Sequence, residues 1–119
     1  MGATPSTLDS ITIAAGDTVS SSVRQAQHNG VLVTVCLPAA MTNTKFHFQG
    51  SPDGTTWFDI YLAKANGNPS KYEINFAANA ALSLDPTPFY SAHYVRLAVD
   101  SPEAETREFK LAFFSVPTQ

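Results

Sequence analysis

Three histidines and one cysteine are the side chains in this sequence best suited to metal binding or nucleophilic catalysis. His28, His47 and His93 lie far apart, and none has a second ligand-type residue two or four positions away, where one strand or helix would present both. The alternating segment around His47 favours a solvent-facing strand position. Cys36 lies in the apolar run VLVTVCL, where a thiolate is costly to bury. The sequence therefore predicts no metal site and no thiol nucleophile, and we expect Cys36 to be a buried or semi-buried free thiol.

The carboxylates lie mostly in predicted turns rather than in facing pairs. Glycoside hydrolysis needs two carboxyl groups that face each other across a cleft. The Asp53-Gly54 pair matches half of a calcium loop, but no D-x-D pattern or glutamate cluster supplies the other ligands. Glycine-rich nucleotide motifs and G-x-S-x-G are absent from the sequence. The acids in predicted turns are Asp17, Asp53, Asp85, Asp100, Glu103 and Glu105. We therefore expect no catalytic residue, no cofactor and no enzymatic activity.

Aromatic side chains give a stronger indication of binding. Exposed aromatics on a surface with few charges are typical anchors for protein partners or for sugar rings. Alternatively, Trp57 packs beneath a loop of its own hairpin. The candidate partner contacts are the aromatics expected outside the core, namely Tyr61, Phe89, Tyr90 and Tyr94.

Residues 45–62, KFHFQGSPDGTTWFDIYL, predict the β-hairpin that positions many of these side chains. Side chains alternate between the two faces of a strand, so Phe46 and Phe48 share the face opposite Lys45, His47 and Gln49. The same period places Phe58, Ile60 and Leu62 on the buried face of the second strand, opposite Trp57, Asp59 and Tyr61. Within the turn, Pro52 presets φ, Asp53 bonds its own backbone and Gly54 tolerates positive φ. We assign Pro52, Asp53, Gly54 and Trp57 structural roles in this hairpin.

The rest of the chain predicts further short strands separated by turns every 8 to 12 residues. A run of this kind with no helical period indicates an all-β, antiparallel sandwich, jelly-roll-like, of eight or nine short strands. Residues 31–37 are apolar enough for a central strand, residues 18–24 are polar enough for a sheet edge, and two prolines make residues 85–90 a corner with room for one helical turn. The other predicted strands span 8–15, 71–76, 80–84, 94–99 and 107–114.

The length of 119 residues predicts a single domain, which we place at residues 9–116 after a flexible arm at 1–8. A net charge of −3 with scattered basic residues argues against a nucleic-acid partner. No apolar run is long enough for a membrane helix, so we expect no membrane partner. Charged residues make up only 14% of the sequence, well below the usual share of about 25%. This low charge suggests that other protein covers part of the surface.

Three segments together resemble a known family. They are the hairpin FQGSPDGTTWFDIYL with its S-x-DG-T-x-W motif, the corner ALSLDP, and the strand YVRL. As an ensemble over roughly residues 30–114, they are similar to small virion proteins of tailed bacteriophages, the capsid decoration (cement) proteins of jelly-roll or related β-sandwich fold. An S-x-DG-x-x-W hairpin also occurs in discoidin-type, galactose-binding-like sandwiches.

The resemblance implies a structural role on the outside of a bacteriophage capsid. Such subunits, often homotrimers, bind the lattice of the major capsid protein and brace the joints between its subunits. The implied location is the virion surface, after synthesis in the host cytoplasm. Two alternatives remain: a carbohydrate-binding β-sandwich module, and a tail or head-fibre component.

Overall fold

The computed structural model describes residues 7–28, 30–62, 67–90 and 92–115, and the predicted arm therefore lies mostly outside the described residues. β1 begins at Thr7, within the span assigned to that arm. The strands are β1 (Thr7–Ile13), β2 (Val23–Arg24), β3 (Gly30–Cys36), β4 (Lys45–Ser51), β5 (Phe58–Asp59), β6 (Tyr61–Leu62), β7 (Ser70–Lys71), β8 (Glu73–Asn75), β9 (Ala81–Ser83), β10 (Tyr94–Ala98) and β11 (Arg107–Ser115). Two short 3-10 turns, η1 (Gln25–His28) and η2 (Thr87–Phe89), are the helical segments of the described chain. No helix among the described residues has the length and apolar character needed to cross a membrane.

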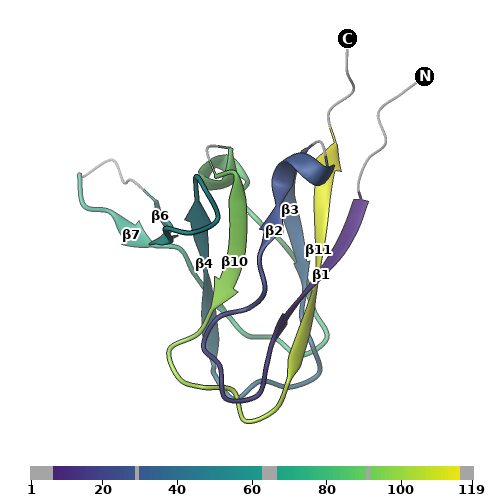
Figure 1. Ribbon diagram of the computed structural model, residues 1–119. Coiled ribbons are helices and arrows are strands. Elements are labelled where there is room, and N and C mark those ends of the chain that lie inside the picture. Colours follow the sequence, from purple (N-terminus) through teal and green to yellow (C-terminus); the bar gives the residue numbers. More distant parts are fainter. Residues whose placement is uncertain (1–6, 29, 63–66, 91, 116–119) are drawn as a thin grey trace.

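The strands pair in a nested order, first with last. β1 pairs with β11, β2 with β10, β3 with β9 and β4 with β8, all antiparallel. This long ribbon wraps on itself because β11 also pairs with β3 and β10 also pairs with β4. The result is a four-stranded sheet β1-β11-β3-β9 facing a second sheet β2-β10-β4, to which β5 and β8 add at the outer edge (Figure 1). Such wrapping is the jelly-roll form of the antiparallel sandwich, and it confirms the predicted fold class.

The core between the two sheets is formed by every second side chain of the strands, the ones that point inward. Phe46 and Phe48 of β4 are 1% and 0% exposed, as their even positions in the hairpin predicted. Phe48 makes an edge-on contact with Phe89, with ring centroids 5.3 Å apart. Burial of each such side chain stabilises the fold by about 1.5–3 kcal/mol. From the other sheet, Phe109, Leu111 and Phe113 close the core with no exposed surface.

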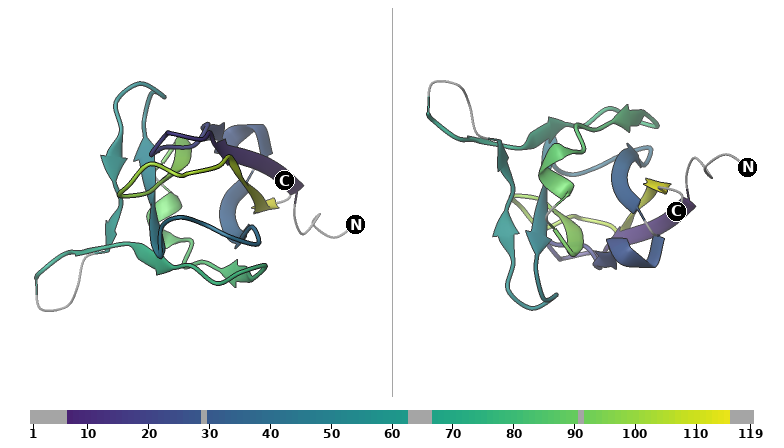
Figure 2. Two further views of the ribbon diagram at one scale, coloured as in Figure 1. Left: turned by 90° about the horizontal axis from the view of Figure 1, so that it is seen from below. Right: turned by 90° about the horizontal axis from the view of Figure 1, so that it is seen from above.

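The second strand of the hairpin is shorter than predicted. Only the two residues of β5 pair with β4, because β8 pairs with the other half of β4. The chain then leaves the sheet, and β6 pairs with β7 in a small two-stranded hairpin that projects from the sandwich (Figure 2). Phe58, expected in the core, is 60% exposed, and Leu62 is half-buried. Of the three predicted core residues, only Ile60 packs against the core cluster.

The turn between β4 and β5 has the predicted chemistry. The Ser51 hydroxyl oxygen accepts hydrogen bonds from the amides of Asp53 and Gly54 at 3.2 and 2.8 Å. The Asp53 carboxylate accepts from the amides of Thr55 and Thr56, and chiefly these bonds lower its pKa below the ordinary value. Gly54 has φ +79°, as expected for this turn. The Asp53 carboxylate therefore stabilises the turn by accepting hydrogen bonds from backbone amides within it.

Replacing Gly54 by valine should destabilise the protein by about 1–3 kcal/mol. A side chain at this positive φ is strained, and its Cβ would lie 3.3 Å from the ring of Tyr94. Chemical denaturation of Gly54→Val beside Thr55→Val, an exposed neighbour, measures the difference. Equal midpoints for the two variants would show that the turn tolerates a side chain.

Buried Glu103 joins three loops at the end of the sandwich opposite η1 and η2 (the lower end in Figure 1). Its carboxylate accepts hydrogen bonds from the amides of Thr42 and Asn43, from Asn43 Nδ2, and from Arg107 Nε at 2.9 Å. Its backbone exchanges two further bonds with the β1–β2 loop, at Gly16 and Asp17. One carboxylate therefore holds the lower end together.

Candidate functional site

The outward side of the sheet containing β4 carries a connected set of polar side chains, which we call the outer polar face: His47, Gln49, Asp59, Glu73, Arg96 and Asp100. The strand period of two explains their common side, because the alternate residues of β4 and β10 point into the core. Pairing then aligns them across strands: Gln49 lies opposite both Asp59 and Arg96, and His47 lies opposite Glu73.

A chain of contacts crosses this face. The guanidinium of Arg96 lies 4.3 Å from the ring centroid of Trp57, and its Nε donates to Gln49 Oε1 at 2.7 Å. Gln49 Nε2 in turn donates to Asp59 Oδ1 at 2.8 Å. Trp57, half-buried, is therefore part of the face and has one ring side covered by a cation. A sugar ring has correspondingly less of this indole to stack on.

Asp59 is the centre of the network. Its Oδ1 is 3.1 Å from Nε2 of His47, and its Oδ2 is 3.6 Å from Nζ of Lys71. The hydrogen bond from Gln49 is the largest cause that lowers the pKa of Asp59; partial burial opposes it, and His47 and Lys71 add to the lowering. Asp59 is therefore ionised at neutral pH.

His47 is buried, with 5% of its surface exposed, so the solvent-facing position predicted from its strand pattern was wrong. His47 lies on β4 between β8 and β10, and Asp59 contacts its ring. Burial, followed by the positive charge of Lys71, lowers the pKa of His47 below 6.5, although Asp59 opposes this shift. The imidazole is therefore neutral at pH 7.

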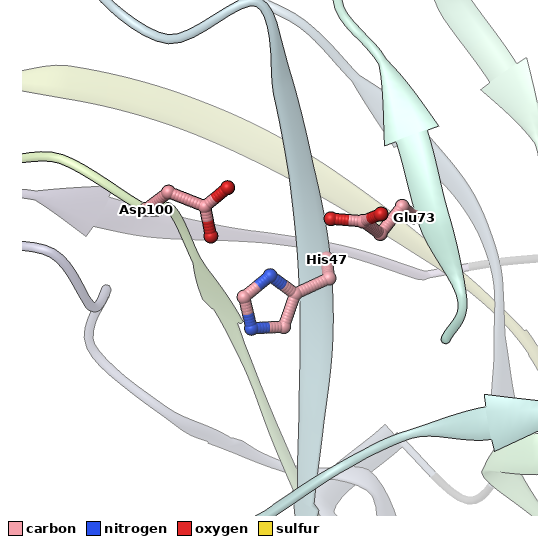
Figure 3. A group of neighbouring side chains, drawn as sticks. All are labelled: His47, Glu73 and Asp100. Atoms are coloured by element: carbon pink, nitrogen blue, oxygen red, sulfur yellow. The ribbon is translucent and has the colours of Figure 1, made fainter. Parts of the chain in front are cut away.

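Three ligand-type side chains converge at one end of this face. Donor atoms of His47, Glu73 and Asp100 all lie within 4.8 Å of one another (Figure 3). Glu73 is paired directly with His47, and Asp100 follows Ala98, the other partner of His47, by two residues on the same side. Sequence reasoning missed this group because its members belong to different parts of the chain. Only the register of β8 and β10 against β4 brings them together.

A second feature is the group of large apolar side chains that solvent reaches. Phe58, Tyr61, Tyr90 and Phe114 are 60%, 52%, 71% and 44% exposed. Tyr61 and Tyr90 were predicted partner contacts, and both are accessible. Phe89, also a predicted contact, is fully buried against Phe48, so it cannot meet a partner and that assignment was wrong.

Two shallow hollows lie beside Phe58 and Tyr90, and residues of η1 and η2 contribute to their lining. η1 and η2 lie at the upper end of the sandwich in Figure 1. One, of about 200 Å³, is lined by Phe58, Pro88 and Ala92 among others. The other, of about 250 Å³, is lined by Tyr90 and again by Ala92. We call the surface formed by Phe58, Pro88, Tyr90 and Ala92 the aromatic end. Tyr94, a further predicted contact, is half-buried there against Gly54.

Comparison with known proteins gives little further information. No protein-family model matches the chain, and no curated protein matches it. Among solved structures, the crystal structure of the Yersinia pseudotuberculosis-derived mitogen aligns with 97% of this chain and 90% of its own, at 14% identity and a TM-score of 0.40. A likeness of this degree assigns no family and no function to the chain.

Proposed function

We propose that this protein is a structural component of a bacteriophage virion that binds the outside of the capsid and stabilises the shell. The observation that carries the proposal is the meeting of family-like segments and the chain between them at the aromatic end. The hairpin supplies Phe58, the residues directly after the ALSLDP corner supply Pro88 and Tyr90, and the YVRL strand begins at Tyr94 beside Gly54 of the hairpin turn. The hairpin and the chain between the corner and the YVRL strand therefore build one exposed surface.

The chemistry of the aromatic end suits contact with protein. Among the described residues that line its two hollows, Asp59 and His93 are the only ones with an acidic or basic side chain. Depletion of charge around exposed aromatics is characteristic of the centre of a protein interface. Burial of Phe58 and Tyr90 against the major capsid protein would contribute about 25 cal/mol per Å² of apolar surface, less the cost of association.

Weak single contacts are sufficient for this role when several act together. In a homotrimer, the first subunit to bind raises the effective concentration of the other two, which can increase affinity by about 10² to 10⁴. A protein that binds the assembled shell and not its separate subunits shifts the equilibrium towards the shell by linkage.

Co-sedimentation with capsid shells tests the proposal. Shells assembled from the major capsid protein of the same genome should bind the purified protein saturably. Phe58→Ser and Tyr90→Ser should each weaken this binding about tenfold or more, because buried aromatics dominate interface energies. Phe114→Ser is the matched control, since this exposed aromatic lies on the other sheet.

Two results would contradict the proposal. One is the absence of co-sedimentation at any protein concentration, and the other is unchanged binding by the Phe58→Ser/Tyr90→Ser double variant. Light scattering of the free protein separately tests the trimer, and a monomer at micromolar concentration would exclude it.

A further inference from the structure

His47, Glu73 and Asp100 combine the ligand types of a transition-metal site: one imidazole nitrogen and two carboxylates. Their donor atoms lie within 4.8 Å of one another, and bonds of about 2.0–2.2 Å to Zn²⁺ require ligands about 3.5 Å apart. Glu73 and Asp100 are both exposed, so small rotations of two surface side chains close the difference. Figure 3 shows both carboxylates directed towards the imidazole.

The orientation of His47 provides a second, independent observation. Its side chain is 6% exposed, and Nε2 is held by Asp59 at 3.1 Å. The other ring nitrogen, Nδ1, points towards the carboxylates in Figure 3 and has no hydrogen-bond partner among the described residues. With the proton on Nε2, Nδ1 presents its lone pair to the group. A carboxylate that holds the far nitrogen of a metal-bound histidine is a recurrent arrangement, because it fixes the ring and its tautomer.

We propose that these three residues form a binding site for a divalent transition-metal ion of the Zn²⁺ type. The imidazole nitrogen disfavours Ca²⁺ and Mg²⁺, which prefer oxygen ligands throughout. Three protein ligands leave at least one coordination position for water or for an acidic side chain of a partner. A bound ion would join β4 to β8 and to the segment after β10, and so it would brace the sheet that carries the outer polar face.

Lys45 competes with the metal for Glu73. Its Nζ lies 3.3 Å from Glu73 Oε2, with the two side chains 45% and 32% exposed. Because ion pairs at such exposure contribute little, a cation held by three ligands displaces the ammonium at small cost. Removal of this ammonium should therefore tighten metal binding, an effect opposite to that of removing a ligand.

Isothermal titration with ZnCl₂ on tag-free protein tests the site. Wild type should bind one Zn²⁺ saturably, with a rise in Tm, and Cys36→Ser should bind equally. Glu73→Gln and Asp100→Asn should each weaken binding tenfold or more, and Lys45→Met should strengthen it. Glu108→Gln, an exposed carboxylate on the other sheet, is the matched control and should not change the affinity.

Nitrogen NMR of the imidazoles locates the ion without mutation. Zn²⁺ should shift Nδ1 of His47 and leave His93 unchanged. No saturable binding by wild type, equal affinity in the Glu73→Gln/Asp100→Asn double variant, or Zn²⁺-dependent shifts at another histidine alone would overturn the proposal. The measurement uses neither capsids nor the aromatic end, so its failure is independent of the proposed function.

Discussion

Replacing Glu103 by alanine should destabilise the protein by about 3–5 kcal/mol, which is a large part of the total stability of a domain this size. The side chain is fully buried, and Arg107, which donates to it, is only 14% exposed. The variant leaves a nearly buried guanidinium without its partner. It also frees the backbone amides of Thr42 and Asn43, which now donate to the carboxylate. Differential scanning calorimetry should show a fall in Tm of roughly 10–20 °C.

Glu105→Ala provides the matched control, because this exposed acid lies in the same loop. It should change the free energy of unfolding by less than about 0.5 kcal/mol. Similar losses for the two variants would mean that Glu103 does not hold the lower end together.

The same carboxylate should make stability depend on acid pH. Burial alone would raise the pKa of Glu103, but the amides of Thr42 and Asn43 and the side chains of Asn43 and Arg107 together hold it below 4.5. A lowered folded-state pKa means that the unfolded chain binds protons more readily. This contribution is therefore complete well above pH 4.5 and is lost as the pH falls through the folded-state pKa. Urea titrations should show a shallower acid-side loss for Glu103→Ala than for wild type.

Gln25→Ala should cost about 2–4 kcal/mol, the second large effect that we expect. Gln25 is 5% exposed, and its amide bridges the two 3-10 turns at the upper end. Oε1 accepts from the amide of Leu32 at 2.8 Å, and Nε2 donates to the carbonyl oxygens of Phe89 and Ala92 at 2.8 and 2.5 Å. Truncation leaves these buried backbone groups without partners. Equilibrium unfolding in urea measures the loss.

Gln27→Ala is the matched control, because Gln27 is exposed in the same turn. A similar stability for Gln25→Ala and Gln27→Ala would show that water replaces the bridging amide. Because η2 and the residues after it carry Pro88, Tyr90 and Ala92, Gln25→Ala should also weaken the capsid binding that we propose for the aromatic end. Gln25→Glu should be more harmful still, since a carboxylate would face two carbonyl oxygens.

Local pattern was sufficient for the fold class. Alternation placed Phe46 and Phe48 in the core, and the apolar run at 31–37 predicted β3, which lies between β11 and β9. Polar residues at 18–24 predicted the edge of a sheet, where β2 lies. Two prolines predicted the corner that holds η2. The number of strands was underestimated, because the second strand of the predicted hairpin is divided into β5 and β6, and the strand predicted at 71–76 into β7 and β8.

The sequence-based predictions of burial were wrong where residues distant in the chain, rather than the local pattern, determine whether a side chain is covered. The strand period predicts a core position for Phe58. It is exposed because β5 lies at the edge of its sheet and the chain then continues into the projecting β6-β7 pair. His47 alternates as a surface residue, yet strands on both sides and Asp59 above bury it. Phe89 was assigned to the surface from its corner, and the turn η2 directs it into the core. The two-residue period of a strand shows which side chains share a face, but it does not show whether other residues cover that face.

Glu103 illustrates the same limit for polar residues. Its sequence context, Ser-Pro-Glu-Ala-Glu, indicates a solvated turn, and nothing local separates Glu103 from Glu105. Its burial depends on loops that begin far away in the chain and meet only when the sandwich closes.

Strand period, turn chemistry and apolar runs act over a few residues, so the order of amino acids by itself determined the antiparallel strands, the glycine turn and the inward phenylalanines. Pairing between distant strands determined the rest: the nested ribbon, the aromatic end and the group of His47, Glu73 and Asp100. The physical reason is that the register between two strands depends on core packing across both sheets, which no short segment of the chain specifies alone.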